Sequence, residues 1–156
     1  LLARALVNVA GAGPGKRVLD PMCGTGGVLI EAGLVGADVV GIDVQGKMVR
    51  GARENLAHYL DGATVCRGDA THLPLCDGSV DAVVFDAPYG RQSKVVGDLA
   101  MLVEAALAEA RRVAPRCVLV ADRSWREAAE RAGWSVESTF ERRVHRSLVR
   151  YVLVLE

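Results

Sequence analysis

Short apolar runs alternate along most of the chain with longer segments in which apolar residues recur at helical spacing. Runs rich in Val, Ile and Leu are typical of strands, whereas apolar positions three or four residues apart indicate a helix with one buried face. The predicted strands are 17–20, 38–43, 63–67, 80–86 and 117–121. The predicted helices are 1–10, 26–35, 47–60, 99–113 and 125–132, and Pro115 ends the fourth of them.

The last part of the chain departs from this alternation. Two strand-like segments, 135–143 and 147–155, have no helix between them, and their tight connection implies a β-hairpin. Residues 151–155 are apolar on both faces, as expected of a covered strand. The chain therefore predicts a mainly parallel α/β sheet with an antiparallel edge region. The least regular stretch, 90–98, is expected to serve as a substrate loop.

Length and composition predict one globular domain. The chain has 156 residues, of which 51% are apolar and 24% are charged. No apolar run approaches the roughly 20 residues of a membrane span. Arg4 and Asn8 interrupt the first apolar segment, which therefore indicates an amphipathic helix and not a signal peptide, and we expect a cytoplasmic protein. The chain does not begin with Met, so we expect a fragment of a longer protein.

The charge balance does not by itself point to nucleic acid. The formal net charge is zero, although Arg greatly outnumbers Lys among the 19 basic residues. Arg suits bidentate phosphate contacts, and a GC-rich genome produces the same bias. Two basic clusters occur, at 111–116 and 142–150, and the first is interpreted as a solvated face.

The cysteines do not indicate a metal or redox site. Cys23, Cys66, Cys76 and Cys117 form no C-x-x-C pair, and we expect no metal. Free buried thiols in a reducing compartment are the simplest interpretation. Cys23 lies where it can touch a cofactor, but a catalytic thiolate needs a base partner, and the sequence indicates none.

A glycine-rich loop follows the first strand. Asp20 ends that strand, and Gly24 and Gly26 follow four and six residues later. This order differs from the G-x-G-x-x-G of dinucleotide sites, and the carboxylate of Asp20 would repel a pyrophosphate. The loop suits a cofactor with a positive centre and an amino group, namely S-adenosylmethionine, and disfavours an NAD-dependent dehydrogenase.

Two further acids lie at or just beyond the ends of successive predicted strands, 38–43 and 63–67. Asp43 is placed to accept both ribose hydroxyls, and Asp69 is placed to accept the adenine amino group. The carboxyl ends of parallel strands meet at one edge of an open sheet, where such sheets bind ligands. The alternative interpretation is that these acids stabilise turns and helix N-termini.

A further motif, Asp86-Ala87-Pro88-Tyr89, begins at the last residue of the fourth predicted strand. Methylation of an exocyclic amine needs acceptors for both N–H groups, which the Asp86 carboxylate and the Ala87 carbonyl can provide. Pro88 biases Ala87 to an extended conformation, and Tyr89 can stack on an extruded base. Such acceptors stabilise positive charge developing on the nitrogen. The alternative is a simple β-turn, since all these residue types are compatible with turns.

These motifs resemble those of class I S-adenosylmethionine-dependent methyltransferases that act on amino groups, whose fourth motif is Asp or Asn, Pro, Pro and an aromatic residue. Residues 20–33, 68–71, 86–91 and 143–150 are similar to the archaeal tRNA guanine-10 N2-methyltransferase family, and the likeness covers nearly the whole chain. It implies a Rossmann-like sheet of strand order 3-2-1-4-5-7-6, with one antiparallel strand and helices on both faces.

The resemblance also implies site residues. Asp20, Gly24 and Gly26 would bind the methionine part of the cofactor, Asp43 the ribose and Asp69 the adenine, while Asp86 and Tyr89 would hold the guanine. The full expected cofactor site is Asp20, Met22, Cys23, Gly24, Thr25, Gly26, Asp43, Val44, Asp69 and Ala70. The residues expected to contact RNA phosphates are Arg91, Lys94 and Arg146, with His145 as a further candidate that is more typical of a surface turn.

Two departures from that family bear on the expected function. Ala87 replaces the first proline of the fourth motif, which keeps the carbonyl acceptor and lowers local rigidity. Full-length members also carry an N-terminal THUMP-containing RNA-binding region, to which nothing in this chain is similar. We therefore expect a catalytic domain that binds tRNA weakly on its own.

The expected function is transfer of one or two methyl groups to N2 of a guanine in tRNA, at position 10, by a monomer. One alternative is an amino-methyltransferase acting on adenine N6 in DNA, or on rRNA. Another is a domain that binds the cofactor but is inactive without its RNA-binding region.

Overall fold

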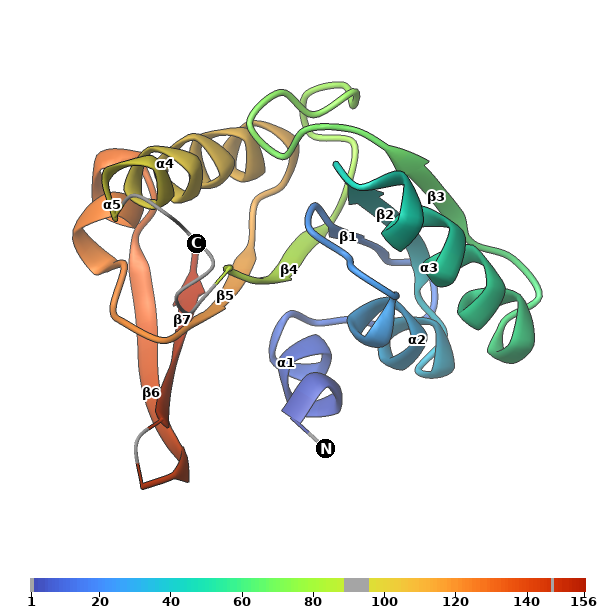
Figure 1. The fold of residues 1–156 in the computed structure, drawn as a ribbon, viewed down its shortest axis with the longest axis horizontal. Coiled ribbons are helices and arrows are strands. Elements are labelled where there is room, and N and C mark those ends of the chain that lie inside the picture. The colour runs from blue at the N-terminus through green and yellow to red at the C-terminus, as the bar shows by residue number, and fades with distance from the viewer. Residues whose placement is uncertain (1, 89–95, 147) are drawn as a thin grey trace.

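The computed structural model describes residues 2–88, 96–146 and 148–156. Seven strands form one sheet, in the order β3-β2-β1-β4-β5-β7-β6, with helices around it (Figure 1). The strands are β1 (Arg17–Asp20), β2 (Asp38–Asp43), β3 (Thr64–Arg67), β4 (Ala82–Asp86), β5 (Cys117–Ala121), β6 (Val136–His145) and β7 (Leu148–Leu155). The helices are α1 (Leu2–Val9), α2 (Gly27–Leu34), α3 (Gly46–Tyr59), α4 (Val96–Val113) and α5 (Arg126–Arg131).

Strand directions follow the expected pattern. β1 pairs in parallel with β2 and β4, β3 in parallel with β2, and β5 in parallel with β4. β7 runs antiparallel to both of its neighbours, β5 and β6. The expected strand order, the single antiparallel strand and the terminal hairpin are therefore confirmed.

Two apolar clusters cover the two faces of the sheet. One joins α4 and α5 to sheet residues such as Leu19, Phe85 and Leu119. The other joins α1, α2 and α3 to residues such as Val18 and Val84. Adjacent strand residues fall in opposite clusters because successive side chains of a strand point to opposite faces. The central strands are therefore apolar throughout, and polar side chains gather at their ends.

Most element boundaries differ from the prediction by one to three residues, and two elements, α4 and β6, extend more than one residue beyond it. α4 begins at Val96, within the stretch 90–98 that is expected to be irregular. The negative charge of Asp98, in the first turn, interacts favourably with the positive end of the helix dipole and so stabilises this helix start. The remaining residues of that stretch up to Val95 lie outside the described residues. β6 continues to His145, two residues beyond its predicted end, because it keeps pairing with β7 as far as His145 and Leu148.

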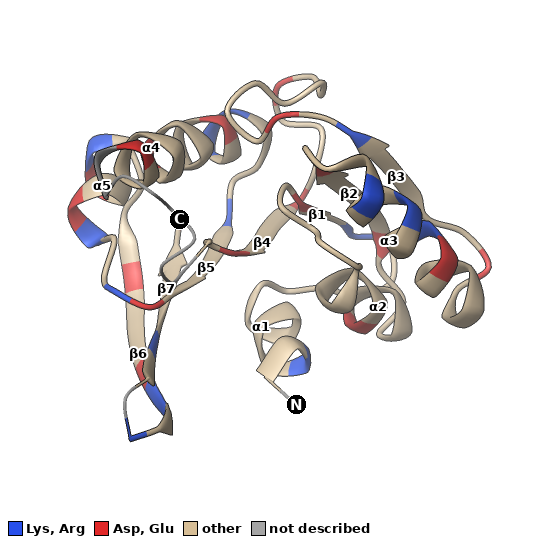
Figure 2. Cartoon of the chain, viewed as in Figure 1, with Lys and Arg blue, Asp and Glu red and all other residues tan. Residues whose placement is uncertain are grey.

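The β6–β7 hairpin extends away from the rest of the sheet (Figure 1). Its outer part is exposed and basic, and Figure 2 shows Lys and Arg positions gathered towards its tip. The exposed residues there are Arg142, Arg143, Val144, His145 and Arg146. Within the described part of the chain, no helix is long and apolar enough to cross a membrane.

All four cysteines are free thiols. Cys23 and Cys117 are buried as expected, whereas Cys66 is half-buried and Cys76 is exposed, so the expectation of four buried thiols was wrong. Cys76 lies in the irregular connection between β3 and β4, where the chain runs over the surface and no sheet covers it.

Gly41 allows the loop after β1 to lie against β2. A Cβ at this buried position would lie 2.5 Å from Leu29 Cδ1 and 3.1 Å from Cys23 Sγ. We therefore predict that Gly41→Ala lowers the free energy of unfolding by roughly 1–3 kcal/mol through overpacking. Chemical denaturation measures this change. Gly62→Ala is the matched control, because a Cβ there has no atom of the described residues within 4 Å apart from its chain neighbours. Equal effects of the two substitutions would contradict the account.

Candidate active site

Asp20, Asp43 and Asp86 are the last residues of β1, β2 and β4. These strands are parallel neighbours, so the three carboxylates end at the same edge of the sheet. Asp43 and Asp86 both lie close enough to Asp20 for their charges to raise its pKa. The arrangement agrees with the expectation that Asp20 and Asp43 lie together at the carboxyl edge, and Asp86 joins them there.

The side chain of Asp20 is buried, with an exposed fraction of 3%. The Met22 backbone N–H donates to Asp20 Oδ1 at 3.0 Å, and among the described residues no basic side chain forms an ion pair with this carboxylate. Burial raises the pKa of Asp20 to about 7, and the neighbouring carboxylates add to this effect. A carboxyl group buried in this way favours binding of a cationic ligand, because a nearby positive charge stabilises its ionised form.

Asp43 fixes the glycine loop to the end of β2. Its Oδ2 accepts a hydrogen bond from the Gly24 N–H at 2.9 Å, and its Oδ1 accepts one from the Gln45 N–H at 2.9 Å. Each carboxylate oxygen has a second lone-pair direction, so these bonds leave capacity for a ligand hydroxyl. The sequence pattern placed Asp43 at the site but did not reveal that it also holds the loop.

The loop itself depends on two left-handed glycines. Gly24 has φ +52° and Gly26 has φ +90°, values that other residues rarely adopt. Apart from the two chain neighbours of Gly24, no atom of the described residues lies within 4 Å of a Cβ built on it, so the loop presents bare backbone there. The loop is tied down by the Cys23 N–H, which donates to the Ile42 carbonyl at 2.9 Å.

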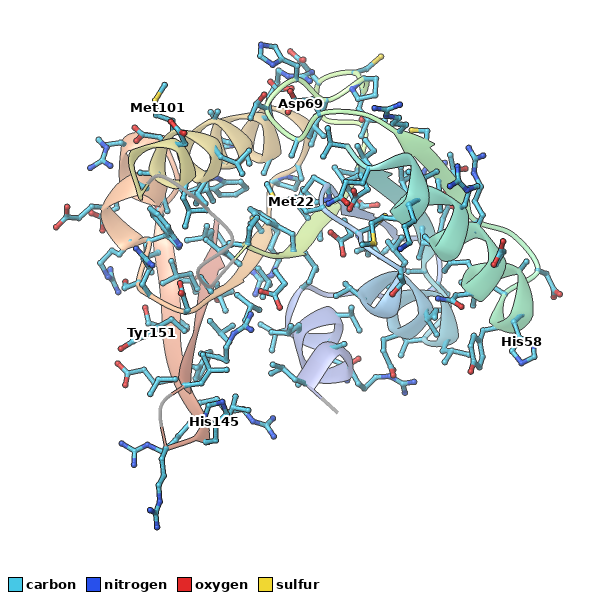
Figure 3. The ribbon with its side chains drawn as sticks, viewed as in Figure 1. Met22, His58, Asp69, Met101, His145 and Tyr151 are labelled. Carbon is cyan, nitrogen blue, oxygen red and sulfur yellow. The ribbon has the colours of Figure 1, made fainter. Side chains whose placement is uncertain are left out.

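The other residues expected in this loop have distinct positions. Cys23 is buried, and burial together with the nearby Asp20 raises the pKa of its thiol to about 12, so it is not a thiolate at neutral pH. Met22 packs against the core cluster that includes α4, and Figure 3 shows it near the middle of the molecule. Thr25 is exposed, and its carbonyl accepts a hydrogen bond from Asn55 Nδ2 at 2.9 Å. Asn55, on α3, thus helps to hold the glycine loop, a role that the sequence pattern did not indicate.

Asp69 occupies the loop after β3 and is exposed (Figure 3). Its Oδ1 accepts hydrogen bonds from the Thr71 N–H at 2.8 Å and from Thr71 Oγ1 at 2.7 Å, and these bonds lower its pKa. Asp69 therefore stabilises a turn, as the alternative interpretation held, and its expected adenine contact stays a prediction. Ala70 packs in the core, whereas Val44 is 60% exposed at the end of β2.

Asp86, at the end of β4, is more exposed than Asp20 and Asp43, with 47% of its side chain exposed. The buried guanidinium of Arg150, on β7, donates to Asp86 Oδ1. Burial raises the pKa of Asp86, and Arg150 opposes this shift. The Ala87 N–H donates to the Val120 carbonyl at 2.8 Å, which extends the β4–β5 ladder, and Pro88 is exposed.

The remaining expected residues divide into two groups. Tyr89, Arg91 and Lys94 lie outside the described residues. Arg146 is exposed at the end of the hairpin, and the picture of charged residues shows this tip to be basic (Figure 2). The sequence reasoning also missed Arg150 as a site residue, having grouped it with a basic cluster, because the chain alone does not show that its side chain points inward.

The edge therefore combines a buried carboxylate suited to a cation, a loop of bare backbone, and a half-exposed carboxylate with a fixed peptide beside it. Among the described residues, no group of three or more His, Cys, Asp or Glu side chains is arranged to hold a metal ion. The arrangement suits binding of a cationic small molecule next to a group that accepts N–H donors.

The raised pKa of Asp20 predicts a pH-dependent stability. Between pH 3.8 and about 7 the folded protein binds more protons at Asp20 than the unfolded chain, so this group lowers stability as the pH rises through that window. We predict that Asp20→Asn raises the free energy of unfolding at pH 8, by at most about 4 kcal/mol, and that the gain disappears towards pH 4.

Denaturant titrations of the ligand-free protein at several pH values measure this gain. Asp61→Asn, at an exposed position, is the control and is expected to have little effect at any pH. A gain for Asp20→Asn that is the same at pH 4 and pH 8 would show that Asp20 is not the buried titrating group.

Known proteins were compared with the chain. A family model described as RMKL-like, methyltransferase domain, matches residues 1–152. A tRNA (guanine(10)-N2)-dimethyltransferase of Methanothermobacter thermautotrophicus is 40% identical, over 99% of this chain and 48% of the relative. A U6 snRNA (guanine-N(2))-methyltransferase of Mus musculus is 31% identical over 66% of this chain and 20% of the relative.

Among solved structures, the crystal structure of TrmN from Thermus thermophilus has a TM-score of 0.83 and 32% identity, covering 99% of this chain and 48% of that one. The chain thus spans about half the length of the curated relatives that it matches along nearly its whole length. The matched residues include every strand that forms the carboxyl edge described above. By the extent of the family match and the identity to these relatives, the chain belongs to the RMKL-like methyltransferase-domain family.

Proposed function

We propose that this domain binds S-adenosylmethionine at the carboxyl edge of the sheet and methylates N2 of a guanine in tRNA. The observation that carries the proposal is the juxtaposition of Asp86, half-exposed at the end of β4, with the buried carboxylate of Asp20 and the loop held by Asp43. Relatives that match nearly the whole chain are named as tRNA guanine-N2 methyltransferases, which supports this substrate class.

The residues present fit this cofactor. The Asp20 carboxylate, buried without an ion-pair partner among the described residues, suits an ammonium or sulfonium group. The open space at Gly24 lets a ligand approach the backbone closely. Asp43 retains lone pairs for ribose hydroxyls, and the exposed Val44 offers an apolar surface to the adenine. When bound, S-adenosylmethionine supplies an electrophilic methyl group.

Asp86 and Ala87 prepare the amine that is methylated. The exocyclic nitrogen of guanine is a poor nucleophile because its lone pair is delocalised into the ring. The Asp86 carboxylate accepts one N–H and the Ala87 carbonyl accepts the other, which directs the nitrogen lone pair away from the ring plane. The bond from the Ala87 N–H to the Val120 carbonyl holds the peptide group between Asp86 and Ala87, next to the acceptor carbonyl, without the first proline of the usual motif. The same acceptors stabilise the positive charge that develops on the nitrogen.

The RNA contact is assigned to the exposed basic end of the β6–β7 hairpin. Arg142, Arg143 and Arg146 are exposed there, on a two-stranded ribbon that extends from the sheet. Guanidinium groups bind phosphates bidentately, and this binding positions the substrate independently of its sequence. Arg91 and Lys94 follow Asp86 closely along the chain and are proposed to contact phosphates near the target base. Modification at position 10, a monomeric state and a cytoplasmic location belong to the same proposal.

A second candidate substrate is an snRNA guanine. Relatives named as U6 snRNA guanine-N2 methyltransferases match about two thirds of this chain at 31–35% identity, which supports the same chemistry on a different RNA. The two candidates share every residue of the proposed site and differ only in the RNA that is captured.

Asp43→Ala is predicted to weaken binding of S-adenosylmethionine by about 1.5–3 kcal/mol, because hydrogen bonds to a charged group are lost. The loop also loses the anchor of the Gly24 N–H. Isothermal titration of the wild-type protein and the variant measures this loss. NAD is the control ligand and is expected to give no binding heat with either protein. Unchanged affinity for S-adenosylmethionine would remove Asp43 from the site.

Asp86→Asn is predicted to lower kcat for RNA methylation by roughly 100-fold or more, on the scale of removing a transition-state hydrogen-bond partner, with cofactor affinity nearly unchanged. The assay follows N2-methylguanosine by mass spectrometry after incubation with a tRNA transcript. A transcript with inosine in place of the target guanine lacks the exocyclic amine and is expected to stay unmodified. Loss of cofactor binding in Asp86→Asn would contradict the assigned role.

The same assay tests the proposed function as a whole. Methylation of a U6 snRNA fragment in preference to tRNA would favour the second candidate. Tight cofactor binding with no methylation of either RNA would contradict the proposed function and favour the alternative, a domain that binds the cofactor but is inactive without a further RNA-binding region.

A further inference from the structure

Arg150 is the one Lys or Arg that is buried among the described residues. It is the third residue of β7, and only 7% of its side chain is exposed. A guanidinium remains charged at any pH at which the protein is folded, and burying it is costly unless it is paired and hydrogen-bonded. Its burial therefore calls for a specific carboxylate partner.

That partner is on a strand that β7 does not touch. β7 pairs with β5 up to Tyr151 and Ala121, and β5 pairs with β4 at Val120 and Asp86. Arg150 lies one residue beyond the last β5–β7 pair, and its Nη2 donates to Asp86 Oδ1 on the far side of β5. The antiparallel edge of the sheet thus contributes a cation to the edge where the parallel strands end.

The ion pair with Arg150 makes the two carboxylate oxygens of Asp86 different from each other. Oδ1 accepts the bond from Arg150, and among the described residues no donor is found at Oδ2. Nearly half of the Asp86 side chain is exposed, whereas the Arg150 side chain is buried. The ion pair is therefore open to solvent only at Asp86. A carboxylate held at one oxygen by a buried guanidinium has less freedom to rotate than one that meets only water.

We propose that Arg150 is a positioning residue for methyl transfer: it keeps Asp86 ionised and holds its carboxylate so that the second oxygen is available to the amine N–H of the substrate. This inference rests on the proposed function for the role of Asp86. It adds a residue from β7, a strand that contributes none of the cofactor residues, to the machinery of the reaction.

The surrounding charges explain why such a residue is needed. Asp86 is held among acids, with Asp20 at the end of β1 and Asp122 after β5, and Asp122 raises its pKa. Asp122 is itself paired with Arg123 at 3.1 Å. Burial also raises the pKa of Asp86, and Arg150 is the group that lowers it. Without Arg150, the carboxyl group would retain its proton to higher pH and lose an acceptor oxygen.

The first experiment follows the charge of Asp86 without any substrate. The ¹³C carboxyl resonance of Asp86, assigned by its absence in Asp86→Asn, is titrated in the wild-type protein and in Arg150→Met. The proposal predicts that the titration midpoint rises by roughly 1–3 pH units in Arg150→Met, the usual effect of losing an adjacent opposite charge. Arg150→Lys restores the positive charge and is expected to return the midpoint towards that of the wild-type protein.

Two controls make this result specific. Arg131→Met makes the same chemical change at an exposed arginine paired with Glu104, and it is expected to leave the Asp86 midpoint unchanged. Arg150→Gln takes the place of Arg150→Met if that variant does not fold, since Gln removes the charge and keeps an N–H donor. An Asp86 midpoint that is the same with and without the Arg150 charge overturns the proposal.

The second experiment measures kcat for tRNA methylation against pH. In the variant lacking the Arg150 charge, the acid limb is expected to move to higher pH with the titration midpoint, and kcat at pH 6 to fall by about tenfold or more. Affinity for S-adenosylmethionine, measured by titration calorimetry, is expected to stay within about twofold. A kcat profile that does not move while the midpoint does overturns the positioning role.

The two experiments separate this inference from the proposed function. If the wild-type protein methylates no RNA, the proposed function is wrong and the role of Arg150 in that reaction falls with it. The carboxyl titration still decides whether Arg150 controls the charge of Asp86. If the wild-type protein is active and the Arg150 variants behave like it in both measurements, only the inference about Arg150 is wrong.

Discussion

Burial of the Asp20 carboxylate at the end of β1 is the constraint on which the carboxyl edge depends. An ionised group with one backbone hydrogen bond and no cation partner among the described residues is expensive in a protein interior, and the raised pKa of Asp20 expresses that cost. The surrounding structure must hold this arrangement against its tendency to relax. The apolar clusters on both faces of the sheet supply that support, because β1 lies in the middle of the sheet and contributes Val18 to one cluster and Leu19 to the other.

The other acids of the edge differ in burial and in the hydrogen-bond donors that stabilise their negative charge, and these differences match their proposed roles. Asp43 is buried and bound by two backbone N–H groups, so it fixes the glycine loop. Asp69 is exposed and closes a turn. Asp86 is half-exposed and held by a buried guanidinium from β7. In the proposed site, one edge therefore contains a carboxylate for a cation, one for the loop and one for a substrate amine.

Much of this arrangement follows from the sequence because it depends on local patterns. β1, β2 and β5 have the bounds that the apolar runs predict, and a strand that ends in an acid places that acid at the carboxyl edge. What the sequence did not reveal depends on side-chain direction and on pairing between distant segments. Arg150 appeared to belong to a basic cluster, and only the register of β7 beside β5 turns it towards Asp86. Asn55 and the second role of Asp43 were missed for the same reason, since hydrogen bonds to a loop carbonyl or N–H leave no mark in residue spacing.

The central claim is that the buried Asp20 carboxylate receives the cationic part of S-adenosylmethionine. The most direct test is titration calorimetry of the wild-type protein and Asp20→Asn with S-adenosylmethionine at about pH 6.5, where an α-amino group is protonated, in buffers of different ionisation enthalpy. The account predicts that the wild-type protein releases protons on binding, because the incoming cation lowers the pKa of Asp20, and that Asp20→Asn binds more weakly and releases none. Equal affinities, or the same proton exchange in both proteins, would contradict it.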